Sequence, residues 1–578
     1  MKIQITNQEN KFSRLMVLYS LLLAMTLIMP MTVFSQWSQG PVSVAVNNQT
    51  NPVITIDGSG GTIIAWQDYR SATNSDRGLN KYDIYVQRLS SNGSALWATN
   101  GIPVCIVDSN QFNPKIVSDG SGGAIICWED KRNATGTDIY VQRVNSSGQA
   151  QWTTNGIPVC TPVFEQDSIA MIGDGFGGAI LTWQDYRSNN GFADIYAQRV
   201  NSSGGMVWTA NGVNICNQAA AQRGPKLLSN GSGGAFITWF DSRAGDYDIY
   251  TQLISTGGAV QWTTNGAATC TMATDQLRPD ICSDGAGGFI ITWYDYRSTT
   301  DYNIYAQRQG PAGGIIWAVD GVVMNNNVAY AQIDPKIVSD GMGGAIISWT
   351  DYRTGVAPGT ADIYSQRVNS TGAVQWTATG VIICTAAGDQ VKSQLVSDGN
   401  NGAYIVWEDH RNAGNSDIYA QRIASNAVIT WAATGFPISS VPLDQLNPMI
   451  AVDGNLGAII TWQDYRSGTN FDIYATRFNT LTGTGNSEIT VKEYSLSQNF
   501  PNPFNPVTSI EYQLPNNGNV KITVYDAIGS EVSTLVNETQ SAGNHSISFN
   551  ASSFPSGVYF YRLNAGSFVS VKKMMLIK

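Results

Sequence analysis

One fourteen-residue motif recurs along the chain and constrains its fold more than any other feature. It reads DGSGGTIIAWQDYR at residues 57–70 and DGNLGAIITWQDYR at residues 453–466, and Asn230 replaces the leading Asp in the fourth of eight copies. The tryptophans of the copies lie at steps of 62, 55, 56, 54, 56, 58 and 55 residues. They are Trp66, Trp128, Trp183, Trp239, Trp293, Trp349, Trp407 and Trp462. A period of this size indicates a repeat architecture.

Each repeat contains four strand-like segments. In the second repeat they read QFNPKIVSDG, GGAIICWED, DIYVQRVNSSG and AQWTTNGIPVC. They are rich in Ile, Val, Tyr, Trp and Thr, and Asp-Gly, Gly-Gly, Asn-Gly and Ser-Gly pairs that favour tight turns separate them. Each repeat is therefore predicted to be an antiparallel four-stranded sheet. Such units are typical of an all-β propeller rather than of a helical solenoid.

A second tryptophan series predicts how the ring closes. The fourth segments contain only seven of these residues: Trp97, Trp152, Trp208, Trp262, Trp317, Trp376 and Trp431. The last third segment, FDIYATRF, runs into LTGTGNSE without a fourth segment, while Gln36-Trp37 matches Gln151-Trp152. We expect the strand at Trp37 to complete an eighth blade, which removes the open sheet edges.

The N-terminal segment has the pattern of a secretory signal. Lys2, Lys11 and Arg14 precede an apolar run over residues 15–34, with small residues before a cleavage site after Ser35. This predicts a signal peptide over residues 1–35. The alternative is an uncleaved membrane anchor, because the run is about as long as a membrane-spanning helix.

The charge argues against a protein that binds nucleic acid or a membrane surface, and the placement of the cysteines argues against a disulfide framework. Only 13% of the residues are charged and the net charge is -10, which does not favour binding to nucleic acid or to a membrane surface. Five cysteines occupy one repeat position, and equivalent positions in successive repeats are too far apart for disulfides. These are Cys105, Cys160, Cys216, Cys270 and Cys384. They are expected to be small buried hydrophobes, with a single bridge between Cys270 and Cys282 left open.

The Trp-x-Asp-x-Arg element is interpreted as scaffold rather than as catalytic machinery. A catalytic site needs one asymmetric constellation, whereas Trp66, Asp68 and Arg70 have counterparts in every repeat. Across the next loop stands a further acid, Asp83 in the first repeat, with Asn303 in the fifth. Arginine pairing with these carboxylates across the loop would fix the hairpin. The DGxGG segment lacks the further carboxylates of a calcium loop, so it predicts a turn and no metal site.

Candidate binding residues lie where the repeats differ. Each first segment begins with a glutamine: Gln49, Gln111, Gln166, Gln222, Gln276, Gln332, Gln390 and Gln445. In a propeller this point lies near the mouth of the central channel. The charged residues that follow in different repeats form the predicted binding face, with solvated loop charge as the alternative: Asp167, Arg223, Arg278, Asp334 and Lys392. Two histidines provide neither a metal site nor a Ser-His-Asp triad, and no cofactor is predicted.

The repeat ends before a C-terminal region of different composition. Residues 36–485 are assigned to the propeller, 486–493 to a linker and 494–578 to a small antiparallel β-sandwich. Prolines at Pro501, Pro503 and Pro506 open this region, and turns are expected at Asn517-Gly518 and Ser556-Gly557.

This C-terminal region resembles the C-terminal sorting domain of type IX secretion cargo. The motifs that carry the resemblance are NFPNPFNP at residues 499–506, VYDAIG at 524–529, SGVYFYRL at 556–563 and the ending KKMMLIK. The resemblance implies a β-sandwich that an outer-membrane translocon recognises, and therefore secretion or attachment to the outer cell surface. It marks Gly557, Tyr559, Lys572 and Lys573 as part of the sorting signal. The repeats resemble generic propellers of secreted bacterial proteins.

The near-identity of the repeats favours a non-catalytic binding module for a glycan or a protein over an enzyme. Two alternatives stay open. A carbohydrate-active hydrolase or lyase would use carboxylates on the channel face, and a structural surface-layer component would need no pocket.

Overall fold

The computed structural model describes residues 37–71, 81–325, 329–353, 361–479 and 494–577, apart from residues 413, 455, 497, 500, 501, 503, 541 and 542. The predicted signal peptide over residues 1–35 and the linker over 486–493 lie outside these residues. The chain divides into two compact units, residues 1–483 and 484–578. Within the described residues the secondary structure is all β, and no helix is long and apolar enough to cross a membrane.

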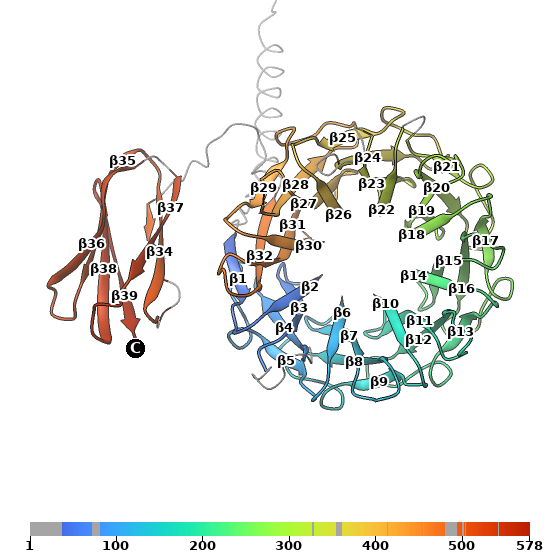
Figure 1. Ribbon diagram of the computed structural model, residues 1–578, viewed down its shortest axis with the longest axis horizontal. Helices are drawn as coiled ribbons and strands as arrows, with labels where there is room; N and C mark the ends of the chain where they lie inside the picture. The colour runs from blue at the N-terminus through green and yellow to red at the C-terminus, as the bar shows by residue number, and fades with distance from the viewer. Residues whose placement is uncertain are drawn as a thin grey trace, which may run out of the picture. The chain divides into compact units, whose positions relative to one another are not determined.

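The first unit consists of four-stranded antiparallel sheets arranged around a central opening (Figure 1). Its innermost strands each begin at the repeated glutamine. They are β2 (Gln49–Ile56), β6 (Gln111–Ser118), β10 (Gln166–Gly173), β14 (Gln222–Ser229), β18 (Gln276–Ser283), β22 (Gln332–Ser339), β26 (Gln390–Ser397) and β30 (Gln445–Val452). The prediction of an all-β chain with repeated four-stranded sheets in a propeller-like arrangement is confirmed.

The second strands form the most buried layer, because each lies between two neighbours of its own sheet and between two adjacent sheets. Every described side chain in most of these strands is buried, including all eight repeat tryptophans at 0% exposure. They are β3 (Thr62–Asp68), β7 (Ala124–Asp130), β11 (Ala179–Asp185), β15 (Ala235–Asp241), β19 (Phe289–Asp295), β23 (Ala345–Asp351), β27 (Ala403–Asp409) and β31 (Gly457–Asp464).

The third strands place a tyrosine opposite each repeat tryptophan, as in the pair Trp66 and Tyr85. They are β4 (Asp83–Leu89), β8 (Asp138–Val144), β12 (Asp194–Val200), β16 (Asp248–Ile254), β20 (Asn303–Gln309), β24 (Asp362–Val368), β28 (Asp417–Ile423) and β32 (Asp472–Asn479). Short outer strands follow: β5 (Ile102–Cys105), β9 (Ile157–Cys160), β13 (Val213–Cys216), β17 (Ala267–Cys270), β21 (Val322–Val323), β25 (Val381–Cys384) and β29 (Phe436–Ser439).

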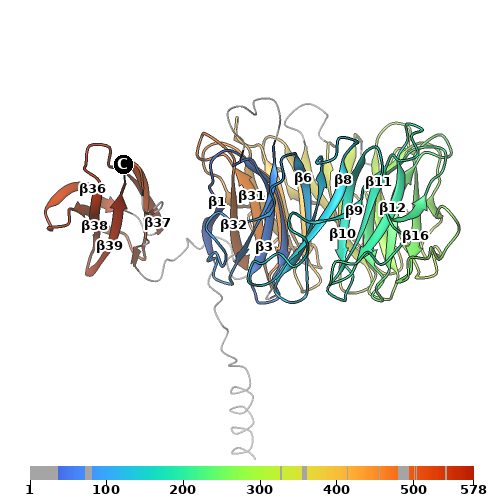
Figure 2. The same cartoon turned by 90° about the horizontal axis from the view of Figure 1, so that it is seen from below.

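The hydrophobic core lies between successive sheets rather than at the centre of the ring. One cluster joins Ile63 and Val86 of one sheet to Ile126 and Trp128 of the next. Burial of this apolar surface stabilises each sheet against its neighbours by about 25 cal/mol per Å². Figure 2 shows the strands of the ring running across its thickness.

The remaining sheet combines the two ends of the repeat region. β1 (Trp37–Ser43) pairs antiparallel with β32, which gives the order β1-β32-β31-β30. Nε1 of Trp37 donates a hydrogen bond of 2.7 Å to the carbonyl of Ser91 in the adjacent sheet. Trp97 donates the equivalent bond to Ser146 at 3.2 Å. The N-terminal strand therefore takes the place that an outer strand has in the other repeats.

The second unit contains two sheets around one hydrophobic core. The three-stranded sheet has the order β33 (Ser495–Leu496), β34 (Val507–Leu514), β37 (Gly543–Asn550). The four-stranded sheet has the order β36 (Glu531–Gln540), β35 (Gly518–Tyr525), β38 (Gly557–Ala565), β39 (Phe568–Leu576). Ile510 from the first sheet and Tyr561 from the second are both fully buried in this core.

Candidate functional site

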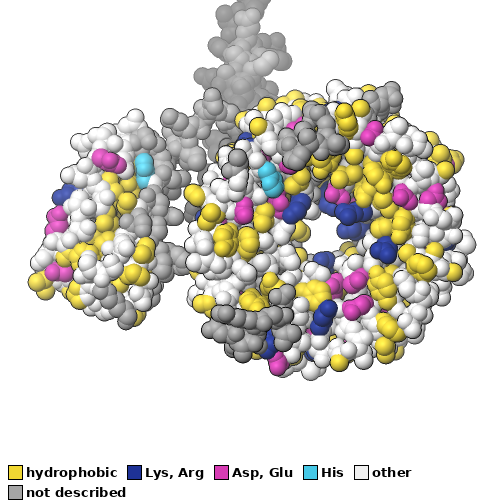
Figure 3. Space-filling view, viewed as in Figure 1, with side chains coloured by type: hydrophobic (Ala, Val, Ile, Leu, Met, Phe, Trp, Pro, Cys, Tyr) yellow, Lys and Arg dark blue, Asp and Glu magenta, His cyan; other side chains and the backbone are white. Residues whose placement is uncertain are grey.

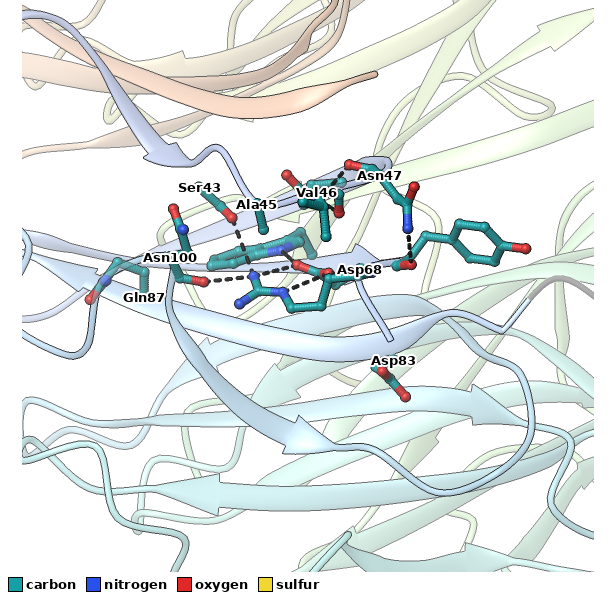
Figure 4. A network of polar contacts seen from close by, with 12 residues as sticks. Ser43, Ala45, Val46, Asn47, Asp68, Asp83, Gln87 and Asn100 are labelled. Carbon is teal, nitrogen blue, oxygen red and sulfur yellow. Dashed lines mark hydrogen bonds and ion pairs between the residues drawn. The ribbon is translucent and has the colours of Figure 1, made fainter. Parts of the chain in front are cut away.

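The repeated Trp-x-Asp-x-Arg element forms a closed hydrogen-bonded clamp (Figure 4). In the first repeat, Nε1 of Trp66 donates to Oδ2 of Asp68 at 2.7 Å. Arg70 donates to both oxygens of the same carboxylate, from Nε at 2.8 Å and from Nη2 at 2.5 Å. The guanidinium also lies over the ring of Tyr85, 3.8 Å from its centroid. The carboxylate is thus fully occupied by contacts inside its own sheet.

All eight repeats contain this clamp. The Trp–Asp hydrogen bonds measure 2.7 to 2.9 Å, the Arg–Asp ion pairs 2.5 to 2.6 Å, and each carboxylate is 0% exposed. A buried carboxylate that accepts bidentate arginine bonds has no free lone pair directed at a ligand. These geometries support the scaffold interpretation.

The clamp corrects one expectation about the arginine. Its ion-pair partner is Asp68, two residues earlier, and not the acid across the loop, Asp83, which accepts a hydrogen bond from Ser71. Arg70 instead extends to the carbonyl of Asn100, before the outer strand, at 2.7 Å. Burial raises the pKa of Asp83 to about 6. The pKa of the equivalent acid in the fourth sheet, Asp248, is raised by burial to about 7.

The DGxGG segment is a turn held by a second ion pair. Oδ1 of Asp57 accepts the backbone N–H groups of Ser59 and Gly61, and Oδ2 accepts Nη2 of Arg88 at 2.8 Å. Seven sheets have this aspartate–arginine pair. In the fourth sheet both partners differ together, as Asn230 and Leu253. No cluster of metal-ligating side chains occurs among the described residues.

The repeated glutamines are structural and do not contact the channel. All eight are 0% exposed. Gln49 lies opposite Asp68 in the sheet, and its Nε2 donates 2.7 Å to the carbonyl of Asn47. This places the start of each inner strand at the same end of its sheet as the Asp-Arg clamp.

Three of the five predicted binding residues line one cavity. Arg223, Arg278 and Asp334 surround a cavity of about 460 Å³ at the inner strands β14, β18 and β22. Lys392 lines a second cavity of about 470 Å³. Asp167 lines neither cavity, and its Oδ1 accepts a 3.0 Å hydrogen bond from Gln184. Figure 3 shows lysine and arginine side chains around the central opening.

An irregularity in every inner strand sets the direction of these side chains. The residue two positions after each glutamine has a positive φ, which is 49° at Arg278, 53° at Asp334 and 55° at Lys392. Non-glycine residues adopt this conformation at a cost unless other contacts hold it. At this point the pairing of the inner strand with the second strand shifts register through a β-bulge, as between Leu277 and Asp280.

At five junctions between sheets, a side chain of the preceding sheet accepts the N–H group of this left-handed residue. Oε1 of Gln463, for example, accepts the N–H of Asn51 at 3.0 Å. The other four bonds have the same form. The accepting position is occupied by Phe240, Tyr294 and Thr350 at the other three junctions. At those three junctions the left-handed residue is charged: it is Arg278, Asp334 or Lys392. A charged surface therefore takes the place of the hydrogen bonds that the other five junctions share.

That charged surface is accessible to solvent. Nη1 of Arg278 lies 2.9 Å from Oδ1 of Asp334, and their side chains are 65% and 41% exposed. Nζ of Lys392 lies 3.0 Å from Oε1 of Glu408. The exposed pair of Arg278 and Asp334 is weak in water, about 0 to 1 kcal/mol, so a ligand group displaces it readily.

A column of residues along the inner strands was not predicted from the sequence. The position four residues after each glutamine reads Val53, Lys115, Ala170, Lys226, Asp280, Lys336, Gln394 and Met449. Lys226 and Lys336 line both cavities, and Lys115 lines the second. Burial lowers the pKa of Lys226. The negative charge of Asp280 opposes this shift, and the positive charges of Lys336 and Lys115 add to it. The available signal was a lysine at this one position in the second, fourth and sixth repeats, with Met449 in the eighth.

The cysteines are all free and buried, so the alternative of a Cys270–Cys282 bridge is wrong. Burial raises the pKa of Cys105 to about 12. The thiol accepts a hydrogen bond from Nη2 of Arg132 at 3.2 Å. Its role is packing at the sheet edge.

Residues 498–578 match the family described as the secretion system C-terminal sorting domain. The chain carries a type IX sorting domain. The recognition made from its motifs is confirmed, and the sorting domain directs the protein to secretion and to the outer cell surface through contact with the secretion machinery. Within it, Tyr559 is buried and donates from its hydroxyl to the carbonyl of Pro555 at 2.8 Å, while Lys573 is exposed. Gly557 begins β38, and Lys572 lies opposite Tyr561 in β39.

Solved structures similar to the chain include several enzymes that act on carbohydrates. An ulvan lyase, a polysaccharide lyase, is 11% identical over 77% of this chain and 100% of its own, with a TM-score of 0.41. An alpha-L-arabinanase from Penicillium chrysogenum is 11% identical over 68% and 99%, with a TM-score of 0.33. NanB sialidase from Streptococcus pneumoniae is 11% identical over 66% and 67%, with a TM-score of 0.33. No curated protein matches the chain.

Proposed function

We propose that the protein is a secreted, non-catalytic binding module that recognises a glycan or a protein outside the cell. In this proposal residues 36–485 form an eight-bladed β-propeller that β1 closes, following a cleaved signal peptide over 1–35. Residues 494–578 form a small β-sandwich for export. The antiparallel pairing of β1 with β32 and the shared core of the two C-terminal sheets support this organisation.

The observation that carries the binding role is the contrast between repeated and non-repeated charges. The repeated aspartates and arginines are closed into clamps within the sheets. The non-repeated Arg223, Arg278 and Asp334 instead face one cavity at the channel mouth. A concave site with a few convergent polar groups is the usual form of a ligand site.

A binding screen tests the proposal. The full-length protein is immobilised and challenged with neutral and acidic polysaccharides and with extracellular proteins, and retention is measured. Arg278→Gln and Lys392→Gln together should weaken retention of the bound class at least tenfold. The matched control is Lys81→Gln together with Lys131→Gln, which also removes two positive charges, one of them from an ion pair with Asp108, outside both cavities. Retention that is unchanged in the mouth variant argues against this site.

A second candidate function rests on Glu129. Burial, together with the nearby charge of Asp167, raises its pKa to about 7. An acid with a raised pKa beside a second carboxylate is the pair that a carbohydrate-active hydrolase or lyase uses. Glu129 accepts hydrogen bonds from Asn113 at 2.9 Å and from the N–H of Ser168 at 3.0 Å. Release of reducing sugar or of unsaturated product that Glu129→Gln abolishes would support the enzyme and contradict the non-catalytic module.

A further inference from the structure

Three lysines of alternate sheets meet in the central channel. Lys115 belongs to β6, Lys226 to β14 and Lys336 to β22, each at the same place in its strand. Alternate sheets of the ring are separated by one intervening sheet, so the three side chains approach the channel from three sides. The corresponding position on the fourth side is Met449 of β30. The cavity of about 470 Å³ is lined by all four residues.

These lysines differ from the repeated arginines, each of which forms an ion pair with a buried carboxylate. Among the described residues, Lys226 and Lys336 donate no hydrogen bond and form no ion pair, whereas each clamp arginine forms an ion pair of 2.5 to 2.6 Å with its carboxylate. Lys115 makes only a 3.4 Å contact with the carbonyl of Pro114. The acid facing Lys226 is Asp280, and its Oδ2 also accepts the N–H of Ile337 at 3.2 Å. Like charges held together without partners destabilise a fold, and such local violations are typical of functional sites.

The lysines favour a ligand with a negative charge, and the other residues that line the cavity indicate what kind of molecule carries that charge. Amide side chains of Asn51, Asn113, Gln394 and Asn447 line it beside the lysines. Amides donate to and accept from hydroxyl groups. The lining residues of this cavity include no aromatic side chain on which a nucleic acid base would stack. Hydroxyl-recognising amides around ammonium groups fit a sugar that carries an acidic substituent.

We propose that this channel binds the acidic sugars of a polysaccharide, with Lys115, Lys226 and Lys336 contacting carboxylate or sulfate ester groups and the four amides contacting hydroxyls. This inference rests on the proposed binding function and names its ligand class. Ammonium groups in a partly dehydrated cavity hold such anions more strongly than lysines on an open surface. The chain as a whole has a net charge of -10, which repels polyanions from its other surfaces and favours binding in the channel.

Calorimetric titration of the full-length protein tests the ligand class. The probes are an oligogalacturonate, a sulfated galactan oligosaccharide, a neutral oligosaccharide of equal length, inorganic sulfate alone and an oligothymidylate. We expect binding of at least one acidic oligosaccharide, and at least 100-fold weaker binding of the neutral one. The carboxylated and sulfated arms distinguish the two sources of negative charge. Equal affinity for the neutral sugar, or binding of the oligothymidylate alone, overturns the proposal.

Channel variants separate this inference from the broader binding function. The pair Lys226→Gln and Lys336→Gln should weaken acidic oligosaccharide binding at least tenfold while the melting temperature stays equal or rises, because repulsion is removed. The pair Lys81→Gln and Lys131→Gln is the control of equal charge change, and neither residue lines either cavity. If a ligand binds and depends on Arg278 but not on the lysines, the proposed function survives and the acidic-sugar site does not. If no probe and no polysaccharide binds, both fail.

Proton linkage provides an independent readout. Because the pKa of Lys226 is lowered and an anion binds only the charged amine, affinity should fall as the pH rises through that lowered pKa, with proton uptake on binding. Lys226→Arg keeps the charge at every pH tested and should remove this dependence while retaining binding. A pH profile that is identical in Lys226→Arg and the parent protein contradicts a contact between Lys226 and the anion.

Discussion

Two layers of the ring use charged residues in opposite ways. At the ends of the second strands, eight aspartates are closed into ion pairs with eight arginines and into hydrogen bonds with buried tryptophans. Along the inner strands, the charges differ from sheet to sheet and face cavities in the channel. The difference shows that repetition in this chain marks residues that hold each sheet, whereas departure from the repeat marks residues that are free to meet a ligand.

The largest expected effect concerns the strand that joins the two ends of the ring. Deleting residues 36–45 removes β1 together with the buried side chains of Trp37 and Val42. Loss of a buried Trp alone costs about 3 to 5 kcal/mol, so we expect a loss of about 5 kcal/mol or more and a sharply lower melting temperature. The measurement is thermal unfolding followed by circular dichroism. An unchanged melting temperature would falsify closure by β1.

The second prediction tests the two layers directly. Asp185→Ala leaves the guanidinium of Arg187 and Nε1 of Trp183 without their buried acceptor, which should cost about 3 kcal/mol. Asp334→Ala breaks an exposed pair and should cost about 0 to 1 kcal/mol. Urea unfolding of both variants measures the two losses. Equal losses would remove the distinction between the layers.

The fourth sheet lacks the ion pair that Asp57 forms with Arg88 in the first sheet, because Asn230 and Leu253 occupy the two positions. Restoring the pair with Asn230→Asp and Leu253→Arg together should be more favourable than the two single changes added, with a coupling energy of about 1 kcal/mol. The control is the same cycle at Asp174 and Arg199 in the third sheet, where the pair already exists. A coupling near zero in the fourth sheet would show that the turn no longer depends on this pair.

A further prediction concerns the pH dependence of stability. The pKa of Asp248 is raised to about 7 by burial, so the folded state favours its protonated form. Its contribution to stability is fully present below about pH 4 and is lost as the pH rises through about 7. Asp248→Asn stays neutral, as Asn303 does in the next sheet, and should unfold at higher urea than the parent at pH 8 but not at pH 4. No difference at pH 8 would contradict the raised pKa.

Much of the fold could be predicted from the sequence because the relevant signals are local. Strand-forming residues alternate with glycine turns within each repeat, and the missing eighth tryptophan of the fourth segments pointed to Trp37. The candidate site was predicted only in part. Arg223, Arg278 and Asp334 do line one cavity, but Asp167 lines neither cavity and the lysine column was missed.

The missed residues show why the site was harder to predict than the sheets. Lys115, Lys226 and Lys336 each lie in a strand whose neighbours read as ordinary alternation, so no short window distinguishes them. The partner of Arg70 was equally ambiguous, since Asp68 and Asp83 both lie beside the loop in sequence. Only side-chain geometry selects Asp68.

The sequence by itself determined the repeated four-stranded sheets and the sorting domain, because strand propensity, turn chemistry and motif order are written in consecutive residues. The tertiary structure decided which side chains meet. Three lysines from non-adjacent repeats enter one channel only because the sheets are arranged in a ring, with their first strands facing the centre. Closeness of that kind depends on the curvature of the whole assembly, which no single repeat encodes.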